Sequence, residues 1–378
     1  MKDNNQPETL AAQALGREDQ ETGALVPPIH VSTTFARLSD YSLADNRSYI
    51  RDHGPSQEQV EAVLCELENG ADAISFSSGL AACTAPFNAL NHGDHVVVSD
   101  TIYHGVLGWL QQFATSRGLQ YSLFPAGDLG EFENAIKPGR TRLAWLETPA
   151  NPTWAVTDIA AFSEVAHRHD VKVAVDSTCA TPVLTQPIKF GADLVCHSAT
   201  KYLNGHSDVL AGMLVTAQKD ALWERIRQHR LLGGSTLGSF EAFLLMRGMR
   251  TLFVRVHKQC ENAMTLARFA EAHPGVEKVY YPGLESDPGH QIALGQMKGG
   301  FGGMLSLLVP GSKDQAIEVA CKAQVFKRAT SLGGVESVLE HRKTSEGDLT
   351  NTPENLIRIS TGIEHVDDLV ADLGQMLG

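Results

Sequence analysis

The chain has 378 residues, 43% of them hydrophobic, and a formal net charge of −13 at pH 7. Single hydrophobic cores stop growing at roughly 250–300 residues, so a chain of this length is expected to form at least two domains. The negative charge and the lack of a basic stripe argue against a nucleic-acid partner, because binding to a phosphate backbone depends on clustered Lys and Arg.

Two further classes of protein are not expected. Residues 1–6 are polar and lack the apolar run of a signal peptide, and no stretch of about 18 apolar residues suggests a membrane span. We therefore expect a cytoplasmic protein with no membrane partner. The cysteines lie in apolar stretches and form no C-x-x-C pair, so we expect reduced core thiols rather than disulfides or a metal site. They are Cys65, Cys83, Cys179, Cys196, Cys260 and Cys321.

The N-terminal segment, residues 1–52, is rich in Pro, Thr and Asn. The Val-Pro-Pro-Ile run at 26–29 is incompatible with a helix interior, so we expect an extended arm that packs on a neighbouring subunit. The pattern changes at Ser56. Apolar residues then follow at helical spacing as far as Leu67, and Asn69 with Gly70 supplies a stop, which predicts a helix.

Strand-like apolar runs then alternate with segments of helix length. The runs lie at 73–76, 95–98, 142–146, 171–175 and 194–196, and residues 158–169 are one of the helical segments. This alternation predicts an α/β domain over residues 53–250 with a mostly parallel sheet. Ligands of such sheets bind at the carboxyl ends of the strands, where Gly79, Glu147, Asp176 and Lys201 are expected.

The remaining residues predict a smaller C-terminal α+β domain, 251–378. A long amphipathic helix is expected from about Arg250 to His273. Strands at 304–309 and 356–360 and helices at 313–322 and 366–376 follow it.

Lys201 follows the apolar run at 194–196 and precedes a loop that contains glycine. A lysine desolvated by the core loses its proton more easily and becomes a nucleophile for a Schiff base with an aldehyde cofactor. The alternative is an exposed lysine after a strand, and these residues alone leave both readings open.

Pyridoxal phosphate is the usual aldehyde for such a lysine, and its ring nitrogen must stay protonated. Asp176 ends a buried run and is the candidate to hold that proton, although an Asp before Ser177 also suits a helix N-cap or a turn. Ser78 and Gly79 open an apolar helical run whose N–H groups suit a phosphate, and Ser198 and Thr200 add hydroxyl donors.

Two further side chains are candidates for ligand contacts. Tyr103 suits stacking on a pyridine ring, although a Tyr after a strand also serves simple packing. Arg358 interrupts an apolar strand, where it must find an anion; a substrate carboxylate suits its planar fork, and a structural ion pair is the alternative.

These motifs together resemble one family. The segment SATKY at 198–202, with GHSD at 205–208, looks like the cofactor-lysine signature of the Cys/Met-metabolism group of pyridoxal-phosphate enzymes. That group contains cystathionine γ-synthases, cystathionine lyases and methionine γ-lyases. Further segments agree with it at 28–35, 78–82, 147–152, 247–252, 331–337 and 358–364.

The resemblance implies a fold, an assembly and residue roles. The fold would be the aspartate aminotransferase-like fold type I of pyridoxal-phosphate-dependent transferases, and the assembly a homodimer with shared active sites, commonly paired into a homotetramer. Lys201 would hold the cofactor, Asp176 its ring nitrogen and Tyr103 its ring face. The other implied contacts are Ser78, Gly79, Leu80, Ser198 and Thr200 for the cofactor, Tyr49 and Arg51 from the second subunit, and Asn151, Ser331 and Arg358 for the substrate.

The chain departs from the family at positions that bear on the substrate. Synthases and γ-lyases of the family typically carry an arginine at the position of Gly108 and a glutamate at that of Thr330, which puts cystathionine as a substrate in doubt. Gly105 replaces the cysteine typical of methionine γ-lyases. Thr330 and Leu332 replace the tyrosine-tryptophan pair of one cystathionine β-lyase type, and the loop at 52–56 is atypical.

The implied activity is β- or γ-elimination, or γ-replacement, on a sulfur amino acid or an O-activated homoserine. Lys201 would take the proton from Cα of the substrate. An aminotransferase of the same fold is an alternative, and a cofactor-binding regulatory protein without turnover is another.

Overall fold

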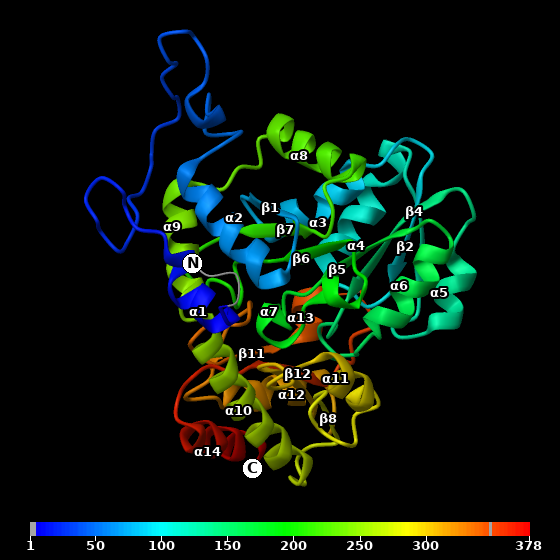
Figure 1. The fold of residues 1–378 in the computed structure, drawn as a ribbon. Helices are drawn as coiled ribbons and strands as arrows, with labels where there is room; N and C mark the ends of the chain where they lie inside the picture. The colour runs from blue at the N-terminus through cyan, green and yellow to red at the C-terminus, as the bar shows by residue number, and fades with distance from the viewer. Residues whose placement is uncertain (1–4, 348–349) are drawn as a thin grey trace.

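The computed structural model describes residues 5–347 and 350–378 and contains two β-sheets, each covered by helices (Figure 1). The larger sheet has seven strands in the order β1-β7-β6-β5-β4-β2-β3. Its strands are β1 (Asp72–Phe76), β2 (His95–Ser99), β3 (Gln120–Phe124), β4 (Thr141–Glu147), β5 (Lys172–Asp176), β6 (Leu194–His197) and β7 (Gly212–Thr216).

The larger sheet is mostly parallel, which confirms the predicted fold class. Strands β3, β2, β4, β5 and β6 pair in parallel, whereas β7 runs antiparallel to both β6 and β1. The sequence analysis did not predict β3 or β7. The exposed edge position of β3 leaves it little apolar signal, and β7 begins with a glycine. A Cβ on Gly212 would lie 2.2 Å from the carbonyl oxygen of Ser78, so only glycine lets β7 pass the chain just before the helix that begins at Gly79.

In the part of the chain that the structure describes, eight α-helices follow the strands of this sheet or flank it. They are α2 (Pro55–Glu68), α3 (Gly79–Asn88), α4 (His104–Phe113), α5 (Leu129–Ala135), α6 (Ile159–Arg168), α7 (Thr181–Leu184), α8 (Ala221–Gly233) and α9 (Ser239–Met249). The predicted helix after Ser56 is confirmed as α2. It begins with Pro55 in the first turn and ends at Asn69, which adopts φ 58°.

Alternate residues of β4 show how the sheet is buried on both faces. Trp145 packs in a core with Phe87 of α3, whereas Leu146 packs on the other face with Phe162 of α6. All four side chains are at most 2% exposed. Burial of both faces explains why these strands have the continuous apolar runs from which they were predicted.

The smaller sheet lies below the larger one in Figure 1 and has the order β10-β11-β12-β9-β8. Its strands are β8 (Lys278–Tyr280), β9 (Met304–Leu308), β10 (Lys327–Arg328), β11 (Val338–His341) and β12 (Leu356–Ser360). Its helices are α10 (Leu252–Glu271), α11 (His290–Gln296), α12 (Lys313–Cys321), α13 (Arg342–Glu346) and α14 (Val366–Leu377). The predicted long helix and both predicted strands are present. The domain boundary at residue 250 stays a prediction.

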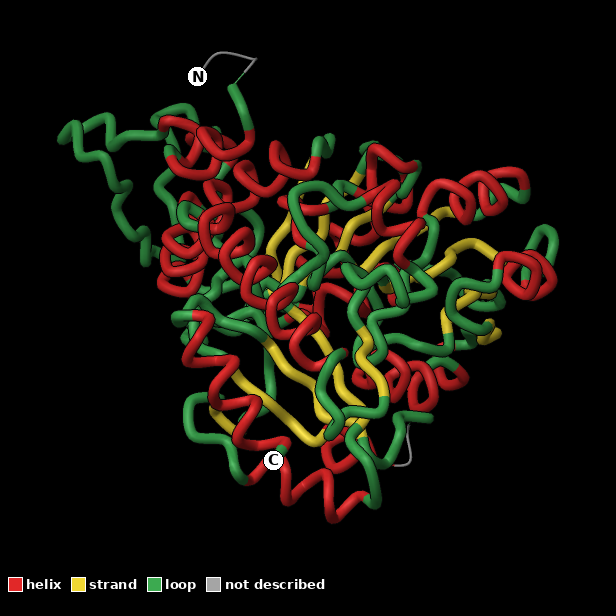
Figure 2. The backbone as a smooth tube through the Cα atoms, turned by 90° about the horizontal axis from the view of Figure 1, so that it is seen from below, coloured by secondary structure: helices red, strands yellow, loops and turns green. Residues whose placement is uncertain are grey.

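The N-terminal segment is not wholly extended. Helix α1 (Pro7–Ala12) packs on the main body, where Ala11 and Ala14 are buried. Between α1 and α2 the chain forms loops that stand away from the rest of the molecule in both views (Figure 1, Figure 2). Short 3₁₀ turns occur at Ala14–Gly16, Ala44–Asn46, Thr115–Arg117 and Pro187–Phe190.

All six cysteines are free thiols, as expected, but they are not all in the core. Cys321 is exposed because it lies in the last turn of α12, on the side of the helix that faces water. Within residues 5–347 and 350–378, none of the helices is both long enough and apolar enough to cross a bilayer.

Candidate active site

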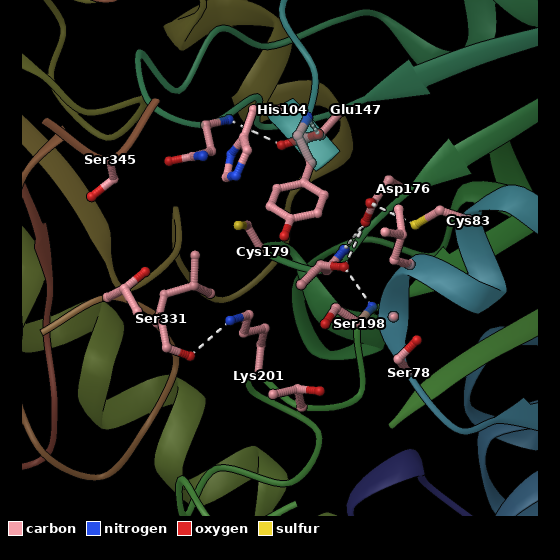
Figure 3. Close-up of a pocket in the computed structure, with 18 of the residues that line it drawn as sticks. Ser78, Cys83, His104, Glu147, Asp176, Cys179, Ser198, Lys201, Ser331 and Ser345 are labelled. Atoms are coloured by element: carbon pink, nitrogen blue, oxygen red, sulfur yellow. Dashed lines mark hydrogen bonds between the residues drawn. The ribbon is translucent and has the colours of Figure 1, made fainter. Parts of the chain in front are cut away.

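One pocket of about 470 Å³ brings together the residues predicted to act within a single chain (Figure 3). It lies where β4, β5 and β6 end, as expected for a parallel sheet, and the loop before β11 closes it. The predicted residues that line it are Ser78, Gly79, Leu80, Tyr103, Asn151, Asp176, Ser198, Thr200, Lys201, Ser331 and Arg358.

Lys201 points into this pocket rather than into solvent. Its Nζ donates a hydrogen bond of 2.7 Å to Oγ of Ser331. Burial, and then the positive charge of Arg358, lower the pKa of the Lys201 ammonium from 10.5 to about 8. An amine that loses its proton near neutral pH is a competent nucleophile and base, so the desolvated reading of Lys201 is the one that the geometry favours.

Ser331 links Lys201 to the predicted carboxylate anchor. Its carbonyl oxygen accepts a hydrogen bond of 2.9 Å from Nη2 of Arg358. Ser331 adopts φ 86°, a conformation rare outside glycine, and such strain persists where the surrounding structure imposes it. Nη1 of Arg358 donates to Oδ1 of Asn151 at 3.1 Å. The three residues expected to hold the substrate therefore contact one another beside the lysine.

Arg358 also has the structural ion pair that the sequence left as its alternative role. Its Nη2 lies 2.8 Å from Oε2 of Glu340, and the side chain is only 3% exposed. Burial lowers the pKa of Arg358 to about 10, so the guanidinium is still charged at neutral pH. The pairing with one glutamate leaves the fork partly open to the pocket, so the two roles are compatible.

Asp176 is a buried carboxylate without a cation beside it in the described part of the chain. Its Oδ1 accepts hydrogen bonds from the N–H and the hydroxyl of Thr178, and among the described residues its Oδ2 accepts a hydrogen bond only from the Cys83 thiol, at 3.8 Å. Burial raises the pKa of Asp176, while Thr178 and His197 lower it. A protonated ring nitrogen placed at Oδ2 would supply the missing partner, so this site fits pyridoxal phosphate.

The start of α3 provides the donors expected for a phosphate. Ser78 caps the helix by accepting a hydrogen bond of 3.1 Å from the N–H of Ala81. The N–H groups of the first turn have no partner within the helix and point outward. A Cβ on Gly79 would lie 2.5 Å from Oγ of Ser198, so glycine is needed for the helix to approach the serine this closely. These features also fit the cofactor.

Thr200 fits the predicted role less directly. Its hydroxyl donates to the carbonyl oxygen of Ala211 at 3.1 Å and accepts from the N–H of Ala211 at 3.0 Å. Both hydrogen bonds tie the lysine loop to the start of β7. Thr200 must therefore give up its bond to the carbonyl before its hydroxyl can donate to a phosphate.

Tyr103 precedes α4 and is held by Glu147, whose Oε2 accepts a hydrogen bond of 2.6 Å from the Tyr103 N–H. Glu147 also accepts from the N–H of Asn151 at 3.1 Å. Burial, followed by the charge of Asp176, raises the pKa of Glu147 to about 8. The sequence placed Glu147 at this edge of the sheet but assigned it no role; it fixes the backbone of two pocket residues.

Tyr49 and Arg51 do not line the pocket of their own chain. They lie before α2, where the Arg51 guanidinium stands 5.0 Å from the centre of the Tyr49 ring and the Arg51 carbonyl oxygen accepts a hydrogen bond from Arg230. Their position agrees with the expectation that they act in the site of a second subunit, and that role stays a prediction.

The sequence analysis missed a buried charged cluster on one wall of the pocket. Nη1 of Arg342 lies 2.9 Å from Oε2 of Glu340, Nε lies 2.7 Å from Oε1 of Glu346, and Nη2 donates to Nδ1 of His104 at 3.2 Å. Arg342 stands in a charged stretch typical of surfaces, so nothing local indicated that it is buried. His104 directly follows the predicted Tyr103, but no motif or hydrophobic pattern in the sequence indicated a role for it.

A second unpredicted group lies beneath Asp176. The thiols of Cys83 and Cys196 are 3.4 Å apart, and with the Asp176 carboxylate they form a set with the spacing of metal ligands. Burial raises the pKa of the Cys196 thiol, and its contact with Cys83 helps to raise that of Cys83. The expectation of no metal site stays a prediction for this group.

The comparisons with known proteins agree with this geometry. The family model described as "Cys/Met metabolism PLP-dependent enzyme" matches residues 8–378. Cystathionine γ-synthase from Mycobacterium tuberculosis is 43% identical over 98% of this chain and 97% of its own length. Cystathionine γ-lyase from Bacillus subtilis is 38% identical over 95% of this chain and 96% of its own. The crystal structure of metB from Corynebacterium glutamicum superposes with a TM-score of 0.95 at 38% identity, covering 99% and 98% of the two chains.

The family match extends over nearly the whole chain, and the pocket supplies a lysine, a buried carboxylate and a helix start suited to the cofactor of that family. The expected fold type I, the pyridoxal phosphate cofactor and the trans-sulfuration class of activity are thereby confirmed. The chain belongs to the Cys/Met metabolism family of pyridoxal-phosphate-dependent enzymes.

Proposed function

We propose that the protein catalyses γ-replacement, in which a thiol displaces the γ-leaving group of an O-activated homoserine. The observation that carries this proposal is the position of Lys201, whose amine is hydrogen-bonded to the residue that also contacts Arg358. An amino acid anchored by its carboxylate at Arg358 would present its Cα and Cβ to that amine. The 43% identity to a cystathionine γ-synthase supports the replacement reaction.

The pocket residues have separate roles in binding the cofactor, orienting the substrate and moving protons. Bound pyridoxal phosphate supplies a ring that withdraws electrons and stabilises negative charge at Cα of the substrate. Asp176 holds the proton of the ring nitrogen, and Arg358 with Asn151 orients the substrate carboxylate. Lys201 removes the Cα proton as a base, and its pKa of about 8 suits proton transfer near neutral pH.

A leaving group on the γ-carbon requires a second proton to move, from Cβ. Lys201 is the only lysine among the described residues that line the pocket, so we assign it this step too. A neutral lysine amine accepts one proton at a time, so Lys201 must give up the Cα proton before it takes the proton from Cβ. After the leaving group departs, the thiol loses its proton and its sulfur bonds to the γ-carbon, and Lys201 delivers a proton first to Cβ and then to Cα. Ser331 holds the amine on this side of the pocket between the steps.

A second candidate reaction is elimination, which ends in a keto acid and ammonia instead of a thioether. One observation favours it. Gly108 has open space where a Cβ would lie, and Thr330, which lines the pocket, is uncharged, so neither position supplies the charges that would hold the far end of a thioether amino acid. The similarity to a cystathionine γ-lyase is consistent with this reaction.

Product analysis distinguishes these reactions. The purified protein would be incubated with O-acetyl- or O-succinylhomoserine plus cysteine, and separately with cystathionine and with methionine. We expect the thioether product from the homoserine ester, detected by mass spectrometry, at a rate above that of keto acid formation. Keto acid as the main product in the presence of thiol would contradict γ-replacement and support elimination.

The same assay addresses the remaining alternatives. Stoichiometric keto acid with conversion of the cofactor to its pyridoxamine form, without released ammonia or thiol, would indicate an aminotransferase. A protein that binds the cofactor but changes none of these substrates would indicate a regulatory role. The Lys201→Ala variant serves as the control for background reactions of free pyridoxal phosphate.

We also propose that the active form is a homodimer in which each site receives Tyr49 and Arg51 from its neighbour, with a homotetramer as the assembly of two dimers. The exposed loops before α2, and the distance of both residues from their own pocket, support this. The free thiols support the cytoplasmic location proposed with it.

Mixing two inactive variants tests the shared site. Each shared site takes Lys201 from one chain and Arg51 from the other. In a hybrid dimer of Lys201→Ala with Arg51→Ala, one site therefore carries both substitutions and the other site carries neither. After unfolding and refolding as a mixture, we expect about a quarter of the wild-type activity if chains pair at random. No recovery beyond the sum of the two separate variants would contradict the shared site; a mixture of Lys201→Ala with Asp176→Ala, which damage the same chain's site, is the control.

A further inference from the structure

The pocket wall opposite Lys201 contains two residues that the proposed mechanism does not use. Figure 3 shows His104 at the upper side of the pocket and Lys201 at the lower side. Arg342, the first residue of α13, also lines the pocket and is 2% exposed. Its Nη2 donates to Nδ1 of His104 at 3.2 Å, so the two side chains form one unit.

This contact determines which nitrogen of His104 carries the proton. An arginine at neutral pH has only donors to offer, so Nδ1 must accept with its lone pair and the proton is on Nε2. Partial burial and then the charge of Arg342 lower the pKa of His104, which keeps the ring neutral. Glu346 and Glu340 hold Arg342 in place through its Nε and Nη1.

Because Nδ1 is occupied by Arg342, the Nε2–H group is the hydrogen-bond donor of His104 that is available to a ligand. No hydrogen bond from Nε2 to a residue within 5–347 or 350–378 is formed, although the ring lines the pocket and packs edge-on against Tyr103 with 4.6 Å between centroids. This wall of the pocket has no excess positive charge that would bind an anion. Arg342 and Arg358 are balanced by Glu340 and Glu346, and the single oxygen Oε2 of Glu340 accepts from both arginines.

Glu340 also places this wall relative to the substrate. Its Oε2 lies 2.8 Å from Nη2 of Arg358 and 2.9 Å from Nη1 of Arg342, so the two guanidinium groups are neighbours. His104, held by Arg342, therefore lies on the same wall of the pocket as the guanidinium that is expected to bind the substrate carboxylate.

We propose that His104 is a specificity-determining residue that donates a fixed hydrogen bond to the leaving group of the substrate, and that Arg342 is the positioning residue that fixes its tautomer. This inference rests on the proposed function. The bond from the γ-carbon to the leaving atom breaks with its electron pair moving to that atom, and His104 keeps its proton throughout. A donor that does not release its proton favours a leaving group that is stable as an anion, such as a carboxylate, over a thiolate, which is a weak acceptor and needs a proton.

Two substitutions at His104 test the donor. In His104→Gln the amide oxygen can accept from Arg342 while the amide nitrogen donates toward the pocket; His104→Leu removes both functions at similar size. The purified holoenzymes would be assayed with O-acetylhomoserine and with methionine as the thioether. We expect His104→Leu to lose roughly 10- to 150-fold in kcat/KM on the ester, the value of a hydrogen bond to a charged group, and about threefold or less on the thioether. His104→Gln should recover most of the ester activity.

The outcomes separate this inference from the proposed function. A wild-type enzyme that consumes neither substrate contradicts the proposed function. A wild-type enzyme that consumes the ester, while His104→Leu keeps its ester activity within about threefold or His104→Gln is as poor as His104→Leu, overturns only the role of His104. A wild-type enzyme that prefers the thioether overturns it too.

The role of Arg342 has its own readout, which loss of packing alone would not change. Nitrogen-15 NMR of labelled histidines, assigned by comparison with His104→Gln, should show His104 protonated on Nε2 in the wild type at pH 7. Arg342→Lys keeps the positive charge between the two glutamates but lacks the guanidinium fork that reaches Nδ1. We expect this variant to populate the Nδ1-protonated form and to lose ester activity as His104→Leu does; an unchanged tautomer would overturn the assignment.

Discussion

We expect the Lys201→Ala variant to lose both the covalent attachment of the cofactor and turnover on every substrate. Lys201 is the only lysine among the described residues of the pocket, so no other side chain is placed to form the attachment or to move the Cα proton. Proton transfer by a positioned side chain contributes roughly 10²- to 10⁴-fold alone, and loss of the second transfer at Cβ adds to it. Visible absorbance of the purified protein measures attachment, and product formation measures turnover.

A matched variant separates the lysine from its surroundings. Ser331→Ala removes the hydrogen bond to Nζ and keeps the lysine, so it should retain attachment with a smaller loss of rate. Thermal unfolding of both variants excludes general misfolding as the cause. A Lys201→Ala protein that still shows the absorbance of bound cofactor and turns substrate over would contradict the central assignment.

The pH dependence of attachment tests the environment of Lys201 in the wild type. The pKa of this lysine is lowered to about 8, so the neutral amine that reacts with an aldehyde becomes the main form above that pH. Below it, the rate at which apoenzyme captures added pyridoxal phosphate should rise about tenfold per pH unit, and above it the rate should level off. A rise that continues to pH 10 would indicate an ordinary exposed lysine.

The sequence predicted those site residues whose local context is distinctive. Asp176 and Lys201 each follow a buried apolar run, and parallel strands bring such positions to one edge of the sheet. Arg358 was noticed because an arginine inside an apolar strand must find an anion. Each of these predictions depended on a charged residue within or directly after an apolar run, and this contrast can be read from the sequence without a structure.

The residues that were missed have no such contrast. Arg342 stands between His341 and Lys343, as a surface residue would, and only the pairing of β11 with β12 and the approach of α4 bury it against His104. Strand β7 was missed because its apolar run is short and begins with Gly212, and its antiparallel direction depends on the return of the chain from the lysine loop. Contacts between distant segments decide these features, so a local pattern cannot predict them.

Arg358→Ala should weaken substrate binding rather than abolish the chemistry. The guanidinium is almost fully buried, and truncating one partner of a buried charge pair costs about 2–5 kcal/mol, or roughly 30- to 5,000-fold in kcat/KM. Glu340 keeps Arg342 as a partner in this variant, so the protein should still fold. We expect the loss mainly in KM, because the carboxylate contact is made equally in the ground state and the transition state.

An amine analogue without the α-carboxylate is the matched control for Arg358. Its binding to the wild-type and Arg358→Ala holoenzymes should be nearly equal, since neither complex has the carboxylate contact to lose. Equal loss for the analogue and the full amino acid would instead make Arg358 a structural residue held by Glu340 alone. The Arg358→Ala substitution should also change the pH dependence of cofactor capture. Because the charge of Arg358 helps to lower the pKa of Lys201, its removal should shift the pH at which apoenzyme captures the cofactor upward from about 8, while Arg358→Lys should leave it nearly unchanged.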